Sequence, residues 1–222
     1  MAAPLMASAR REASAEHESG ATRPTIQPPA PHECAAVWDE PIPAGGSPGL
    51  WLLGAHGGAG VSTLCRWVGP AGDAQRQWPG GHGRQSPFAV VVTEESVAGM
   101  NRAHGLVRQY ATGGAGEHAR LLGVATVARV PGRRPQQVRQ RRDVLAGLLA
   151  QTSGGNARMW AIPFVAGLNT LELADLPVWS LGQEPTTKRR PAPREAVPAT
   201  VADFGTELID AARTQVAAWG GR

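Results

Sequence analysis

The residues best suited to chemistry form a glycine-rich loop. Leu50 to Gly54 is a continuous apolar run, typical of a strand buried on both faces, and Ser62 to Val68 has a helical pattern. Glycines between them allow backbone N–H groups to converge on one anion, and a helix that begins directly afterwards favours negative charge. This arrangement predicts a phosphate or nucleotide site formed by His56, Gly57, Gly58, Ala59, Gly60, Val61, Ser62 and Thr63.

The loop resembles the variant P-loop of the ParA/MinD family of ATPases, whose pattern runs approximately K-G-G-x-G-K-S/T-T. The positions that match this pattern are Gly57, Gly58, Gly60, Ser62 and Thr63. His56 replaces the signature lysine of the family, and Val61 replaces its phosphate-binding lysine. The resemblance implies that Ser62 helps to hold Mg²⁺ and that Thr63 lies near the α-phosphate of a bound nucleotide.

Three later segments extend the resemblance. Residues 90–97 are similar to a late strand and helix of the family, and residues 121–130 are similar to its next strand. Ala128 stands where the family usually has an asparagine that contacts adenine, and residues 161–164 are similar to an isoleucine-proline segment near the nucleotide. The resemblance implies a P-loop-NTPase-like fold and ATP, or another nucleotide with Mg²⁺, as the cofactor.

The middle section of the family, which carries its switch regions and the Walker B aspartate, has no counterpart here. Residues 69–86 are mostly turn residues, Asp73 is their only acid, and the sequence shows no strand that ends in an aspartate. Phosphoryl transfer depends on a lysine and Mg²⁺ at the transferred group. We therefore expect no catalytic residues and a pseudo-NTPase that binds nucleotide weakly or not at all, with no cofactor in the latter case.

Several alternatives remain open at this stage. The loop is a plain glycine turn if Ser62 or Thr63 serves only to cap the following helix. An active ATPase would need another cation, such as Arg66 or an arginine from a second subunit. The family and the arginine-rich, GC-biased composition suggest a regulatory or accessory factor of an actinobacterial chromosome or mobile element. A homodimer and a protein partner of unknown identity are both compatible with that role.

A second candidate site is an arginine cluster. On a helix that begins near Pro135, basic side chains ahead of it and on one of its faces would bind phosphate backbones in a salt-dependent way. This hypothesis of nucleic-acid binding names Arg133, Arg134, Arg139 and Arg142. The alternative is a solvated helix face opposite Val138 and Leu145.

Alternating apolar runs and helical patterns predict an α/β fold, a small and mostly parallel sheet with helices on both faces. We expect further strands over residues 88–93, 121–130 and 159–165, and helices over residues 96–111 and 135–151. Pro163 suggests that the last strand ends there or lies at an edge. The predicted regions are a disordered Pro/Ala-rich tail (1–48), the α/β domain (49–182), a Pro/Arg-rich linker (183–197) and an amphipathic C-terminal helix (198–222).

The composition excludes several classes of protein. The net charge of +4 comes from the central region, because residues 49–182 hold thirteen arginines and seven acids. No apolar run reaches the roughly 20 residues of a membrane helix, and no signal peptide is visible. Two cysteines, Cys34 and Cys65, cannot make a disulfide framework, so we expect a cytoplasmic protein. Trp38, in the predicted tail, is expected to dock onto the domain or onto a partner.

Overall fold

Five parallel strands form one sheet in this computed structural model, which describes residues 25–152, 156–183 and 192–220. The strand order is β2-β1-β3-β4-β5, so the strand that precedes the glycine loop has a neighbour on each side. All pairings are parallel, which confirms the predicted α/β class. The strands are β1 (Leu50–Gly54), β2 (Ala71–Asp73), β3 (Phe88–Glu94), β4 (Arg120–Val127) and β5 (Arg158–Ile162).

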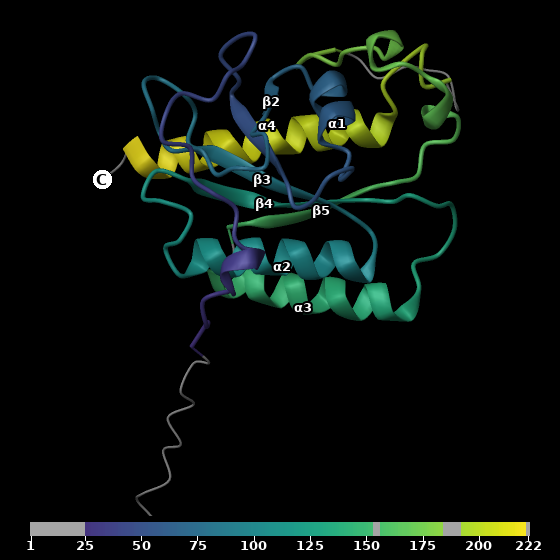
Figure 1. Ribbon diagram of the computed structural model, residues 1–222. Helices are drawn as coiled ribbons and strands as arrows, with labels where there is room; N and C mark the ends of the chain where they lie inside the picture. The colour runs from purple at the N-terminus through teal and green to yellow at the C-terminus, as the bar shows by residue number, and fades with distance from the viewer. Residues whose placement is uncertain (1–24, 153–155, 184–191, 221–222) are drawn as a thin grey trace, which may run out of the picture.

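Helices cover both faces of the sheet, as Figure 1 shows, with α1 and α4 on one face and α2 and α3 on the other. Ser96 caps α2 because its hydroxyl accepts the Gly99 N–H at 3.0 Å. The helices are α1 (Val61–Trp67), α2 (Val97–Ala111), α3 (Gln136–Thr152) and α4 (Ala199–Gly220), and short 3₁₀ turns lie at η1 (Pro31–Glu33), η2 (Leu168–Thr170) and η3 (Leu173–Asp175).

The two faces of the sheet produce two apolar cores. In β1, Leu50 and Leu52 point to the side of α1 and α4, whereas Trp51 and Leu53 point to the side of α2 and α3. All four side chains are at most 1% exposed. This double burial explains why the central strands are continuous apolar runs instead of alternating ones.

The predicted disordered tail is wrong for residues 25–48, which pack on the domain. Ile42 is 3% exposed, and the Trp38 indole N–H donates to the carbonyl of Ala74 at 3.0 Å. The side-chain amide of Gln109 holds the same segment, because it accepts from the Ala35 N–H at 2.9 Å and donates to the Ala35 carbonyl at 2.7 Å. Single anchoring residues order this segment despite its polar composition. Residues 1–24 of the predicted tail lie outside the described residues.

The structure also corrects the interpretation of residues 69–86 as a loop without strands. Residues 71–73 form β2, an edge strand that pairs with β1 and ends in Asp73. At the other edge, β5 ends at Ile162, immediately before Pro163, as the proline suggested. Most of the predicted linker, residues 184–191, lies outside the described residues. Over the described ranges, no helix has the length and apolarity needed to cross a membrane.

Candidate functional site

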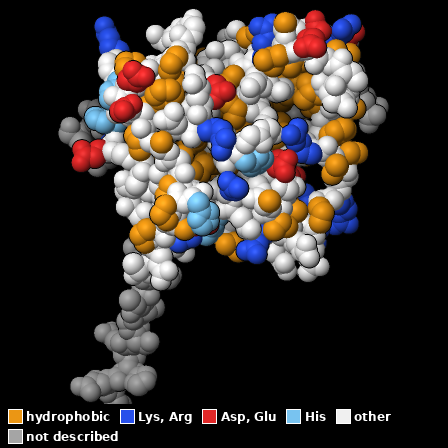
Figure 2. Space-filling view, in the orientation of Figure 1, with side chains coloured by type: hydrophobic (Ala, Val, Ile, Leu, Met, Phe, Trp, Pro, Cys, Tyr) orange, Lys and Arg blue, Asp and Glu red, His pale blue; other side chains and the backbone are white. Residues whose placement is uncertain are grey.

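The glycine loop lies where parallel α/β sheets usually bind ligands, beyond the carboxyl ends of their strands. Residues 55–60 connect the end of β1 to the start of α1. The segments that follow β3 and β4 lie at the same end of the sheet, because Gly54 pairs with Val92 and Glu94 pairs with Val127. Figure 2 shows basic, acidic and histidine side chains lying close together in the middle of the face that it draws.

The loop backbone needs its glycines. Gly58 and Gly60 have φ angles of 76° and 99°, a left-handed conformation that other residues rarely adopt. Gly60 also lies against Val127, whose methyl carbons are 3.6 Å from the place of a Cβ atom. As the N-cap of α1, Gly60 has no side chain to cap the first turn of that helix. The N–H groups of this turn therefore open toward the loop.

Val61, the first residue of α1, is a packing residue. Its side chain is 9% exposed and belongs to the core under α1 and α4. Its Cγ2 atom lies 3.1 Å from the place of a Cβ atom on Gly54. Position 61 therefore brings no charge to the loop.

Arg129, which follows β4, supplies a cation to the loop instead. Its Nη2 atom donates to the carbonyl of Gly58 at 2.6 Å, and its Nε atom donates to the Glu94 carboxylate at 3.3 Å. The Arg129 side chain is 57% exposed, so a ligand has access to it. The sequence analysis did not include Arg129 in the site, because Arg129 and Gly58 are 71 residues apart in the chain.

His56 is held in place by the loop and by the start of the β3–α2 connection. Its Nδ1 atom lies 2.9 Å from the Gly57 carbonyl oxygen, and its Nε2 atom lies 3.4 Å from the Glu94 N–H nitrogen and 3.3 Å from the hydroxyl oxygen of buried Thr93. His56 thus links the loop to the start of the β3–α2 connection.

Glu94 is the anion of the site. A hydrogen bond with the Ser96 side chain is the largest cause that lowers the pKa of this carboxyl below its ordinary value. The hydrogen bond and charge of Arg129 and the charge of His56 lower the pKa further, and partial burial opposes them. The carboxylate is therefore ionised at neutral pH and competes with any bound anion for Arg129. A cavity of about 280 Å³ beside it is lined by His56, Gly57, Arg76, Glu94, Ala98, Gly99 and Arg102. Among the described residues, Arg76 and Arg102 line this cavity with Glu94, and Arg129 contacts both the loop and Glu94.

The side chains expected to contact Mg²⁺ and phosphate are only partly placed for those roles. Ser62 is exposed at the start of α1, and Thr63 is half-buried. Arg66 points away from the loop, because it donates to the carbonyls of Leu176 and Ala174. Asp73, which sequence reasoning did not place at a strand end, accepts the Gln75 N–H at 2.7 Å and lies close enough to α1 to act on Cys65.

Mg²⁺ prefers oxygen ligands, and Ser62 and Asp73 offer such oxygens near α1. Across the ranges that the structure describes, no three His, Cys, Asp or Glu side chains cluster as a metal site.

The four arginines of the predicted nucleic-acid site do not share one free face. Arg134 pairs with Glu95 at 2.6 Å, and the Glu95 side chain is only 7% exposed and also accepts a hydrogen bond from Thr126 at 3.0 Å. Arg133 and Arg139 are exposed and, with Arg134, line a separate cavity of about 570 Å³, whereas Arg142 is half-buried on α3. Arg134 therefore has a structural partner already.

Comparison with known proteins adds no assignment, since no family model, curated protein or solved structure matches this chain.

Proposed function

We propose that this protein binds a phosphate-bearing ligand, specifically a nucleotide, at the glycine loop without hydrolysing it. One observation carries this proposal: the Arg129 guanidinium donates to the Gly58 carbonyl at 2.6 Å and so puts a permanent cation on a loop that has no lysine or arginine of its own. Together with the resemblance to the ParA/MinD family, this supports a regulatory or accessory role for a P-loop-like domain, in which nucleotide binding is read by a partner.

The chemistry of Arg129 suits this role. A guanidinium presents several N–H donors in a fixed plane that matches phosphate oxygens, and it stays charged at every physiological pH. Arg76 and Arg102 are exposed beside the loop and add to the positive potential. A bound phosphate would displace Glu94 from Arg129, because both anions use the same guanidinium. Binding is thus an exchange of one anion for another.

Position 61 supports the proposed absence of turnover. The phosphate-binding lysine of P-loop enzymes reaches the transferred phosphoryl group and stabilises its developing charge. Val61 is buried in the core, and Arg129 approaches the loop at Gly58, ahead of the helix start. A cation so placed contributes to ground-state binding, whereas rate acceleration needs contacts that strengthen in the transition state.

Titration calorimetry with pyrophosphate, ADP and ATP tests the proposal. We expect Arg129→Ala to weaken binding at least about tenfold, because a charge-assisted hydrogen bond contributes about 1.5–3 kcal/mol. Glu94→Gln should tighten binding, since it removes the competing carboxylate. Arg84→Ala is the matched control, because Arg84 is an exposed arginine in a different loop.

The outcomes separate the remaining alternatives. Tighter binding of ATP or ADP than of pyrophosphate supports a nucleotide site, and equal binding supports an anion site without base recognition. If no ligand binds, or if Arg129→Ala and Arg84→Ala behave alike, the proposal is wrong and the loop is a plain glycine turn.

A second candidate, hydrolysis of a nucleotide, is favoured by one observation: Asp73 ends β2 directly beside β1. Release of phosphate from ATP in the presence of Mg²⁺, measured over hours at high protein concentration, tests it. Activity that Asp73→Asn and Gly60→Asp abolish, and that Asp143→Asn on the exposed face of α3 leaves intact, would make the protein an ATPase and overturn the non-catalytic proposal.

A further inference from the structure

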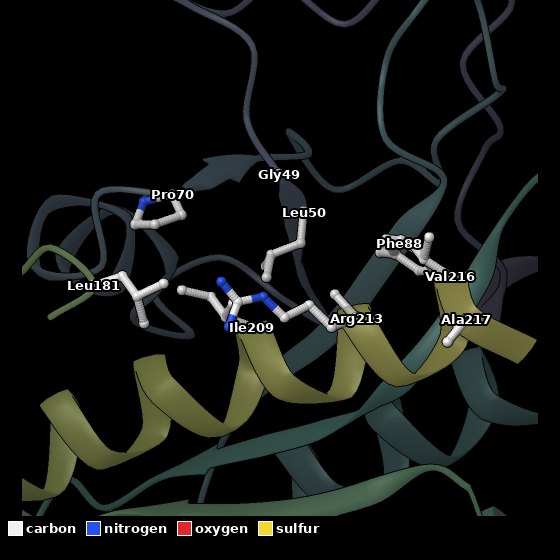
Figure 3. A pocket seen from close by; sticks show the side chains of 10 residues that line it. Gly49, Leu50, Pro70, Phe88, Leu181, Ile209, Arg213, Val216 and Ala217 are labelled. Atoms are coloured by element: carbon white, nitrogen blue, oxygen red, sulfur yellow. The ribbon is translucent and has the colours of Figure 1, made fainter.

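A third cavity lies at the amino ends of the strands, opposite the end that carries the glycine loop. Its volume is about 520 Å³, within the usual range of ligand pockets. Leu50, at the start of β1, and Phe88, at the start of β3, form its floor, and the C-terminal half of α4 forms one wall (Figure 3). The cavity lies at the amino ends of the strands, whereas the loop between β1 and α1 lies at their carboxyl ends, so an occupant would not touch this loop.

The walls of this cavity are apolar and make few polar demands on an occupant. Ile209 and Val216 face it from α4, and Leu181 and Pro70 close it from the other side. Ala212 of α4 also lines it. Val216 is 54% exposed and Leu181 is 45% exposed, although both are large apolar side chains. An apolar ligand here would remove this surface from water, which is the main driving force of such binding.

The backbone at the cavity is already satisfied. The Gly49 N–H donates to the Pro70 carbonyl at 2.9 Å, and the Gly49 carbonyl accepts the Ser86 hydroxyl at 2.7 Å. An occupant therefore gains little from hydrogen-bonding groups along its length.

Arg213 is the one charged residue among the described residues that line the cavity. Figure 3 shows its guanidinium extending along α4 toward Ile209. Its carboxylate neighbour, Asp210, is one turn away on the same helix at 3.8 Å, and the two side chains are 64% and 57% exposed. Exposed pairs of this kind are weak, so an incoming anion can take the guanidinium.

From this arrangement we infer that the cavity binds an amphipathic organic acid, a medium-length aliphatic chain that ends in a carboxylate. The aliphatic chain lies against Leu50, Phe88 and Ile209, and the carboxylate pairs with Arg213 at the rim. The apolar walls favour an aliphatic chain over a polar one, and the single cation favours a ligand with one anionic end. This inference does not depend on the glycine loop, because the two sites share no lining residue.

Titration of the full chain with decanoate, below the concentration at which it forms micelles, tests the inference. We expect saturable binding of one decanoate per chain and weaker binding of decanol and decylamine. Arg213→Gln should weaken decanoate binding about threefold to fivefold and abolish its advantage over decanol. Arg194→Gln is the matched control, since Arg194 is 61% exposed and faces Asp175 at 3.9 Å in an equally loose pair.

Two further variants test the cavity itself. Ala212→Phe should fill it and abolish binding, and Ala217→Trp, at an exposed position of α4, is a second blocking variant with no effect on the core. Absence of saturable decanoate binding would overturn the inference, as would equal affinity for decylamine or indifference to Arg213→Gln. Self-association that Ala212→Phe abolishes, with no decanoate binding, would instead assign the cavity to a second copy of the chain.

Discussion

Val61 and Arg129 are the two residues that most change what the glycine loop can do. Val61 lies at the start of a helix that faces the loop, yet its side chain packs inward against Gly54. Arg129 comes from a different strand and contacts the loop from outside through Gly58. A cation at this loop therefore comes with the β4 connection, and its contribution depends on how that connection is placed.

Introducing a lysine at position 61 is expected to damage the fold instead of activating the loop. Val61→Lys puts an ammonium group into a position that is 9% exposed, so we expect a loss of about 3 kcal/mol in the free energy of unfolding. Urea denaturation measures it, with Ser62→Lys, at the exposed neighbouring position, as the control. A stable Val61→Lys protein that binds ATP more tightly would contradict the assignment of Val61 to packing.

The two cysteines should differ sharply in reactivity. Burial, with a smaller contribution from the charge of Asp73, raises the pKa of Cys65 to about 12, so its thiol stays protonated at every working pH. Cys34 is exposed. A thiol reagent such as dithionitrobenzoate at pH 8 should modify one cysteine per native chain and both in urea. Modification of both thiols in the native protein at equal rates would show that α1 opens readily.

At the scale of elements, η1, α2 and α3 meet around His104. Burial, together with the positive charges of Arg108 and Arg141, lowers the pKa of His104, and the charge of Glu33 opposes this only in part. The folded state thus favours the neutral ring. Since an unfolded histidine takes up its proton near pH 6.5, the stability from neutral His104 is complete above that pH and is lost as the pH falls toward the lowered pKa of the folded state.

The midpoint of urea denaturation between pH 7.5 and pH 5 measures this effect. We expect the midpoint to fall with pH in the native sequence and to fall less in His104→Gln. His32→Gln is the control, because His32 is exposed on η1. An equal pH dependence in all three proteins would remove His104 as the cause.

The elements also show what the sequence could predict and why. Strands β1, β3 and β4 are buried on both faces, and the resulting apolar runs are visible without any knowledge of their neighbours. The three residues of β2 have no such pattern, because their strand character comes only from pairing with β1. Likewise, Arg129 and Asp73 lie near the loop only because of tertiary contacts, and such contacts cannot be predicted from a local sequence pattern. The loop itself was predictable because its glycines and the following helix are contiguous.

At the scale of the whole molecule, one buried side chain holds the N-terminal segment on the domain. Gln109 is 5% exposed, and besides Ala35 it accepts the Trp78 indole N–H at 3.0 Å and donates to the Gly114 carbonyl at 2.8 Å. Gln109→Leu leaves these groups without partners, so we expect a loss of about 3 kcal/mol in the free energy of unfolding.

Limited proteolysis with a glutamyl endopeptidase checks where this loss acts. Cleavage after Glu33 and Glu40 should accelerate in Gln109→Leu, because the segment that carries them is released. Gln140→Leu, at an exposed position of α3, is the control. If Gln109→Leu is destabilised but cleavage stays as slow as in the control, Gln109 supports the core without holding the N-terminal segment.

The order of strands in the sheet has a consequence for how the protein is made. Each strand after β1 pairs with a strand that is synthesised before it: β2 and β3 pair with β1, β4 pairs with β3, and β5 pairs with β4. One face of the sheet is covered later than the strands are paired. This face carries Leu52, Val90 and Trp160, and the largest helix that covers it, α4, follows all the strands in the chain. A nascent chain should thus bear an apolar sheet face throughout the synthesis of residues 163–198, and this face is what a chaperone would recognise.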